Sequence, residues 1–154
     1  MNFKTQILLV AILGLCMSGL NAQQPPDFDA EKAAGIFEYD VEKVIRKLSI
    51  ADDTTQQKVS TALHAYNNKM LDLSFEHAAT FRALAETFDR NVQIAMQRRD
   101  RSQMDGVKAT IQEIIPPIRM QVVAEEKILN EAMAAVLSEQ QNRKWLNYQK
   151  RQKG

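Results

Sequence analysis

The chain has 154 residues, of which 45% are apolar, with 20 basic and 19 acidic residues, five glycines, four prolines and one cysteine. This composition excludes collagen, a low-complexity chain, a disulfide scaffold and a strongly charged disordered tail. The length is that of one domain. Residues 36–105 contain neither glycine nor proline, and the lack of both helix breakers predicts long helices.

Residues 1–22 have the pattern of a secretory signal peptide. Lys4 supplies a positive start, and residues 7–20 form an apolar run that is too short to span a bilayer as a helix. Ala22 ends this region and is followed by Gln23, Gln24 and a proline pair. The sequence therefore predicts export, with a flexible segment at 23–29 and one helical domain at 30–151, followed by a short tail at 152–154.

Cys16 lies inside the predicted signal peptide and has two interpretations. As a lipidation site it has Leu13 and Gly14 before it, but Leu15 stands where a small residue is needed, which disfavours a lipid anchor. The favoured interpretation is an ordinary cysteine that is removed with the signal peptide. Residues 23–154 then contain no cysteine and offer neither a disulfide nor thiol chemistry.

Charge is distributed unevenly along the exported part. Lys4 is the only charged residue in 1–22, so acidic and basic residues balance in the remainder. Residues 23–53 carry a net charge of −4, and residues 136–154 carry +4. An acidic start and a basic end favour antiparallel contact within one chain or between two, although ordinary solvated helix faces explain the pattern equally well.

Two helices are predicted in the first two thirds of the chain. Asp27 or Asp29 is placed to cap a first helix that ends near Leu48. Asp52 or Asp53 is placed to cap a second helix over about 54–99. Along the second helix, apolar positions recur every three or four residues and form one seam, with His77 among them: Val59, Leu63, Tyr66, Met70, Leu73, His77, Phe81, Leu84, Phe88, Val92 and Ala95.

Two further helices follow. Ser102 and Asp105 are placed to start a third, whose apolar stripe runs from Val107 to Val136. Pro116–Pro117 falls inside this stripe and predicts a kink or a short break, because proline lacks an amide donor and clashes with the preceding turn. Ser138 and Gln141 form a capping-box pattern that starts a short basic helix, on which Trp145 and Tyr148 share one face. No strand pattern competes, so the predicted class is all-α with about four helices.

The residues needed for catalysis or metal binding are scarce. His64 and His77 are the only histidines, and 13 residues of helix place them on different faces. Glu-x-x-His and His-x-x-x-His spacings are missing, and no Gly-rich phosphate loop is present. The sequence therefore predicts a protein that is not an enzyme and holds no metal or cofactor. Export also argues against a nucleic-acid partner.

The C-terminal pattern Leu137-Ser138-x-x-Gln141 resembles the Leu-Thr-x-x-Gln motif of the Spy/CpxP group of periplasmic proteins, with Ser138 in the place of Thr. Leu48 to Asp53 stands where the N-terminal copy is expected, and Asp52 or Asp53 is placed to keep its capping role. The resemblance spans roughly residues 40–151. It implies a periplasmic protein with a long antiparallel helical hairpin, flanked by short helices, that forms a curved homodimer.

The resemblance also implies a function. Members of that group are ATP-independent chaperones or envelope-stress regulators, and some respond to zinc. The expected partners are unfolded or misfolded envelope proteins. Candidate residues for client or dimer contact are aromatic side chains, for which plain core packing is the alternative, and arginines, for which a solvated face is the alternative: Phe37, Tyr39, Phe75, Phe81, Phe88, Arg82, Arg90, Arg98, Arg99 and Arg101.

Two other functions fit the same pattern. A helical regulator or adaptor that docks on a membrane sensor would have a similar sequence. A periplasmic metal-responsive protein is the third possibility, although the chain lacks the histidine-rich tail of the zinc-linked members.

Overall fold

The computed structural model describes residues 28–99 and 102–153. Within these residues the chain forms five helices and no strand, which confirms the all-α class. The helices are α2 (Ala30–Ala34), α3 (Val41–Leu48), α4 (Asp53–Arg98), α5 (Gln103–Val136) and α6 (Glu139–Lys153). The predicted signal peptide at 1–22, with Cys16, and the candidate contact residue Arg101 lie outside the described residues.

Helix α4 is the longest element and agrees closely with the prediction. Its 46 residues correspond to about 70 Å at 1.5 Å per residue. Asp52 is its N-cap, and the Asp52 carboxylate accepts a hydrogen bond of 2.7 Å from the backbone N–H of Thr55. The helix ends at Arg99, which adopts a left-handed conformation with φ of 51°.

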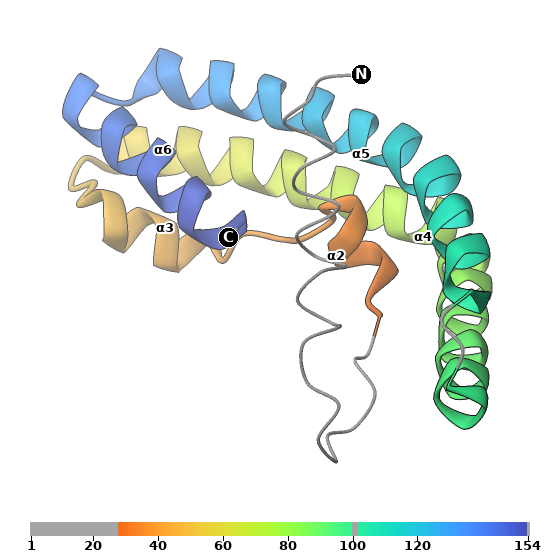
Figure 1. Ribbon diagram of the computed structural model, residues 1–154. Helices are drawn as coiled ribbons and strands as arrows, with labels where there is room; N and C mark the ends of the chain where they lie inside the picture. Colours follow the sequence, from red (N-terminus) through yellow and green to blue (C-terminus); the bar gives the residue numbers. More distant parts are fainter. Residues whose placement is uncertain (1–27, 100–101, 154) are drawn as a thin grey trace.

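Helix α5 runs without interruption through Pro116–Pro117, so of the predicted kink or short break the break is absent. Ile115 and Ile118 on either side of the prolines are buried at 0% and 3% exposure. Packing of these side chains offsets the two lost amide donors. Figure 1 shows α4 and α5 lying side by side and curving together, and α4 contains no proline, so the curvature has a cause beyond the proline pair.

The first predicted helix is in fact two helices, α2 and α3. Gly35, with φ of 83°, ends α2 in the left-handed conformation that glycine adopts without strain. Residues 36–40 are then extended until Asp40 caps α3 by accepting a bond from the N–H of Lys43. The side chain of Asn67 on α4 forms hydrogen bonds with both the backbone N–H and the carbonyl oxygen of Tyr39. These two groups are therefore not available for the hydrogen bonds of a helix. The predicted end at Leu48 is correct.

The three shorter helices form a second layer against the long pair. In Figure 1, α2, α3 and α6 lie on the inner side of the curve made by α4 and α5. Helix α2 contacts both long helices, whereas α3 contacts α4 and α6. The N-terminal and C-terminal parts of the chain thus meet within one molecule, through α3 and α6.

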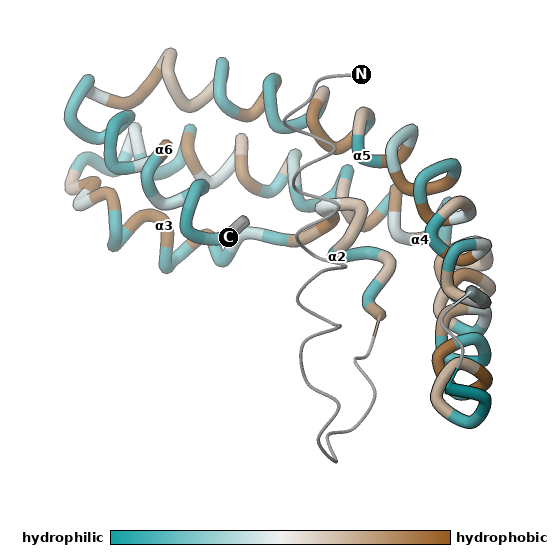
Figure 2. The backbone as a smooth tube through the Cα atoms, in the orientation of Figure 1, coloured by the Kyte–Doolittle hydropathy of each residue, from teal (hydrophilic) through white to brown (hydrophobic). Residues whose placement is uncertain are grey.

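The core lies between α4 and α5 and continues under the three shorter helices. Hydrophobic and hydrophilic residues alternate along each long helix every few positions, as Figure 2 shows. Most of the predicted seam of α4 is buried, and its exceptions His77, Val92 and Ala95 are half-buried. The largest side chains with less than 2% exposure are Trp145, Leu48, Leu63, Met70, Leu84, Ile115 and Met133.

Candidate functional site

Tyr39 is the centre of an aromatic cluster on the inner face of the long helices. Its ring centroid lies 4.9 Å from that of Phe37, 5.3 Å from that of Tyr66 on α4 and 5.0 Å from that of Trp145 on α6. Tyr148, on the same face of α6 as Trp145, lies 6.2 Å away. The extended segment 36–40 therefore inserts one aromatic side chain between α4 and α6.

Polar groups around this cluster fix the segment in place. The Asn67 side chain accepts a hydrogen bond of 2.9 Å from the backbone N–H of Tyr39 and donates one of 2.8 Å to its carbonyl oxygen. Gln149 donates to the Tyr39 hydroxyl at 3.2 Å, and the Trp145 indole donates to Asn130 at 2.8 Å. Asn67 and Gln149 are 9% and 5% exposed, so these bonds satisfy groups that are costly to bury alone.

Burial also governs the chemistry of the tyrosines. Desolvation raises the pKa of Tyr39 well above its ordinary value of 10.0, and the hydrogen bond from Gln149 opposes this only in part. Desolvation raises the pKa of Tyr66 further, and the negative charge of Glu126 adds to the effect. Both phenols are therefore neutral at physiological pH and serve packing rather than acid–base chemistry.

The segment before Tyr39 crosses the long helices at a second place. The Phe28 ring stacks on that of Phe88 with a centroid distance of 4.9 Å. The Ser74 hydroxyl donates to Glu31 at 2.8 Å. Phe28 and Asp29 were predicted to belong to a flexible segment, but Phe28 packs on α4 and Asp29 caps α2.

Large apolar side chains remain exposed outside this layer. Phe75 is 84% exposed, and Leu71, one turn earlier on α4, is 44% exposed. Phe75 is two residues from both Leu73 and His77, so helical geometry turns it away from the seam. The other exposed large apolar residues lie mainly on α5 and α6: Met96, Met120, Val123, Ile128 and Leu146.

The predicted contact residues fall into two groups. Phe81 and Phe88 are buried in the core at 5% and 3% exposure, and Phe37 is half-buried, so core packing explains these three in the folded protomer. Phe75 stands apart because its ring is free for contact. The arginines of the prediction are exposed where the structure describes them: Arg82, Arg90, Arg98 and Arg99.

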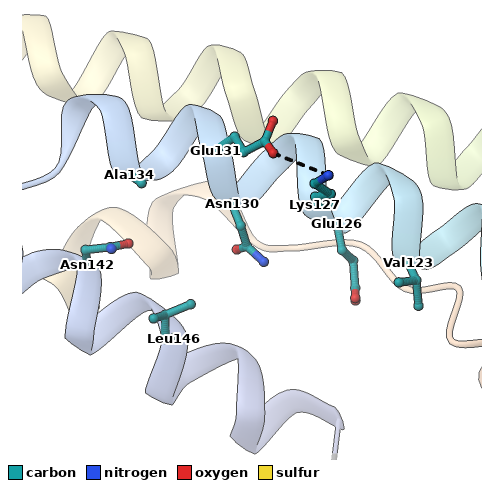
Figure 3. A pocket seen from close by; sticks show the side chains of 8 residues that line it. All are labelled: Val123, Glu126, Lys127, Asn130, Glu131, Ala134, Asn142 and Leu146. Atoms are coloured by element: carbon teal, nitrogen blue, oxygen red, sulfur yellow. Dashed lines mark ion pairs between the residues drawn. The ribbon is translucent and has the colours of Figure 1, made fainter. Parts of the chain in front are cut away.

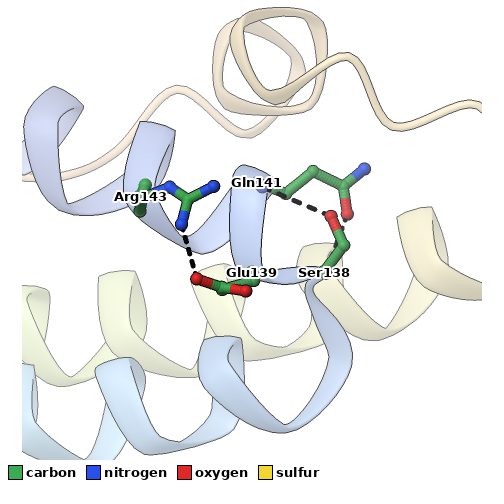
Figure 4. Close-up of polar contacts among 4 residues, drawn as sticks. All are labelled: Ser138, Glu139, Gln141 and Arg143. Carbon is green, nitrogen blue, oxygen red and sulfur yellow. Dashed lines mark hydrogen bonds and ion pairs between the residues drawn. The ribbon is translucent and has the colours of Figure 1, made fainter.

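The motif residues have the structural roles that their pattern predicts. The backbone N–H of Ser138 donates to the Gln141 side chain at 3.0 Å, and the N–H of Gln141 donates to the Ser138 hydroxyl at 3.3 Å. Figure 4 shows this capping box beside the ion pair of Arg143 with Glu139. Leu137 and Leu48 are buried beside their helix ends. The motif therefore sets the start of α6.

A shallow groove of about 440 Å³ lies between α5 and α6. Figure 3 shows Glu126 and Asn130 extending from α5 towards α6, and Leu146 extending back from α6. Lys127 and Glu131 form an ion pair of 3.9 Å at the groove. Its lining mixes apolar and polar groups without any arrangement of nucleophile and base.

The described residues also bear on metal binding and on membrane insertion. Among the residues that the structure describes, no group of three or more His, Cys, Asp or Glu side chains is placed to hold a metal ion. His64 is exposed and His77 is half-buried against Phe81. In the described part of the chain, every helix is too short or too polar to cross a membrane.

Comparisons with models of protein families, with curated proteins and with solved structures found no match to this chain.

Two residues of the inner cluster have no signal in the sequence. Asn67 follows the seam residue Tyr66 without belonging to a motif, and Gln149 lies among the basic residues of α6. Their roles depend on residue 39, which is 28 and 110 positions away.

Proposed function

We propose that this chain is an exported, ATP-independent chaperone of the Spy/CpxP type that binds unfolded or misfolded envelope proteins. Its working form is a homodimer built on the α4–α5 antiparallel hairpin. The curved helical layer supplies a long surface for an extended client, and exposed apolar side chains beside arginines supply the contacts.

The observation that carries the proposal is the exposure of Phe75. A phenylalanine that is 84% exposed gains free energy when a partner covers it, by about 2 kcal/mol for full burial. Leu71 precedes it by one turn, and Arg82 follows by seven residues on the same helix face. This mixed apolar and cationic strip suits unfolded segments of varied sequence, because neither kind of contact requires a fixed geometry.

The test measures suppression of aggregation. We expect the purified chain, at stoichiometric amounts and without ATP, to slow light scattering by an unrelated unfolding protein. Phe75→Ala should weaken this suppression several-fold, since it removes the largest exposed apolar contact. Glu76→Ala is the matched control, because Glu76 is the next residue of α4, is exposed and lacks a large apolar side chain.

Failure of the wild-type chain to suppress aggregation would contradict the proposal. If the chain instead bound one envelope sensor tightly, the regulator class would take its place. Binding of zinc in a calorimetric titration would support the metal-responsive class.

A further inference from the structure

Residues 28–40, here called the N-terminal strap, cross the inner side of the curve formed by α4 and α5. Within the strap only Ala30–Ala34 are helical, and residues 36–40 are extended. Phe28 stacks on Phe88 at one end, and Tyr39 packs on Tyr66 at the other. Figure 1 shows α2, in orange, lying inside the curve, where it contacts both long helices.

The strap is held as a bound peptide is held. In its non-helical part, Ile36 and Tyr39 are buried against the long helices, whereas Glu38 is exposed. Its polar side-chain contacts with α4 are the bond between Glu31 and Ser74 and the two bonds from Asn67. Ala34 of α2 is fully buried, and Gly35 lies beside Val122 of α5, where a Cβ would be 3.8 Å from the valine side chain.

Asn67 indicates what else the same surface is able to bind. It recognises the backbone N–H and carbonyl of one residue, and these groups are the same in every amino acid except proline. Main-chain recognition of this kind gives affinity without sequence specificity, while neighbouring pockets select apolar side chains. Tyr66, which is 3% exposed, provides the aromatic surface beside Asn67. Phe88, also 3% exposed, provides the aromatic surface at the other end of the strap, against Phe28.

We propose that the inner face of α4 and α5 is a peptide-binding site that the N-terminal strap occupies in the resting protein. An extended client segment that carries aromatic or large apolar side chains replaces the strap. This inference rests on the proposed function and assigns to it a regulated site, in which Phe88 becomes a contact residue only after the strap has left. Only molecules in which the strap has left the site bind client, so the apparent affinity for client falls in proportion to the fraction of molecules whose site is free.

The test locks the strap in place. Cys16, the only cysteine of the chain, is replaced by serine, and the pair Glu31→Cys and Ser74→Cys is introduced where the two side chains already meet at 2.8 Å. A short bismaleimide then links the two thiols. The probe is a permanently unfolded, reduced and carboxymethylated protein with a fluorescent label, and its dissociation constant is measured by anisotropy.

We expect the linked form to bind this probe about tenfold or more weakly than the same variant without the linker. Because both forms have the same polypeptide sequence, a folding defect of the variant affects them equally. Lys69→Cys with Asp72→Cys, linked in the same way, is the matched control. Both residues are exposed on α4 and lie outside the strap, so this link should leave binding unchanged.

A second variant tests release of the strap. Phe28→Ala removes the stack on Phe88, and we expect it to bind the probe several-fold more tightly than the wild type. A synthetic peptide of residues 28–40 should compete with the probe on this variant, whereas a scrambled peptide of the same composition should not. Lack of competition by the native peptide would contradict the site.

The two proposals fail in different ways. If the wild type suppresses aggregation but linked and unlinked forms bind the probe equally, the site is wrong and the proposed function stands. If the wild type, the linked form and Phe28→Ala all fail to bind the probe or suppress aggregation, the proposed function fails and the inference fails with it.

Discussion

At the scale of single residues, the two buried tyrosines Tyr39 and Tyr66 differ in whether the hydroxyl group has a hydrogen-bond partner. The Tyr39 hydroxyl accepts a bond from Gln149, whereas the Tyr66 hydroxyl is buried without a hydrogen-bond partner in the described chain. A buried hydroxyl without a partner loses its bonds to water and gains nothing in return. Tyr66 therefore contributes through its ring, and Tyr39 through both its ring and its hydroxyl.

This difference predicts opposite responses to the same substitution. Tyr39→Phe should lower the free energy of unfolding by about 1 kcal/mol, because it leaves Gln149 buried without an acceptor. Tyr66→Phe should be neutral or stabilising, since it removes a buried polar group that has no partner. Chemical denaturation followed by circular dichroism measures both. A larger loss for Tyr66→Phe than for Tyr39→Phe would contradict the assignment.

The same tyrosines predict alkaline sensitivity. Burial raises both folded-state pKa values above the ordinary 10.0, so the neutral phenols contribute stability that is fully present below about pH 10. This stability is lost as the pH rises further, because the unfolded chain ionises first. Tyr66→Phe should extend the stable range to higher pH, as measured by thermal denaturation between pH 8 and pH 11.

At the scale of elements, helix ends follow local side chains, whereas helix continuity follows packing. Asp29, Asp40 and Asp52 each accept a bond from the backbone three residues on and start α2, α3 and α4. By contrast, Pro116–Pro117 does not end α5, because buried isoleucines on either side hold the helix against α4. Local rules therefore predict boundaries better than they predict interruptions.

The proline pair therefore carries a stability cost that substitution should recover. Pro116→Ala with Pro117→Ala restores amide donors to the carbonyl groups of Gln112 and Glu113 and should raise the free energy of unfolding by about 2 kcal/mol. Gly106→Ala, on the same helix and with open space around it, is the control for helix propensity alone. Small-angle scattering should show that the curvature of the molecule is unchanged in this variant, since α4 curves without proline. A straighter molecule would show that the proline pair causes the curvature.

At the scale of the whole molecule, apolar packing rather than charge holds the helices together. The four ion pairs among the described residues all join positions three or four apart on one helix, and they are exposed: Lys69–Asp72, Lys108–Asp105, Lys127–Glu131 and Arg143–Glu139. Where α3 contacts α6, both helices carry more basic than acidic residues, and Lys144 there donates to the Ser49 hydroxyl.

Stability should consequently depend little on salt. Exposed pairs of this kind contribute about 0.3–0.5 kcal/mol each, and screening weakens them. Raising sodium chloride from 0.05 M to 0.5 M should change the free energy of unfolding by less than about 1 kcal/mol. Trp145, the only tryptophan and fully buried, reports global unfolding through its fluorescence. A large loss of stability with salt would instead indicate charge contacts between helices or between protomers.

The sequence by itself determined the helical class, the extent and the seam of α4, and the capping box at Ser138. These features depend on residues three or four positions apart, and that spacing is fixed by the geometry of the helix. Even the exposure of Phe75 is contained in its position off the seam.

Only the tertiary structure decided the division of the first helix, the continuity of α5 through its proline pair, and the place of the strap. Each of these depends on contacts between distant parts of the chain, such as the two bonds by which Asn67 holds the backbone of Tyr39. A local pattern cannot specify such contacts, because the path of the chain through space decides which distant groups satisfy one another.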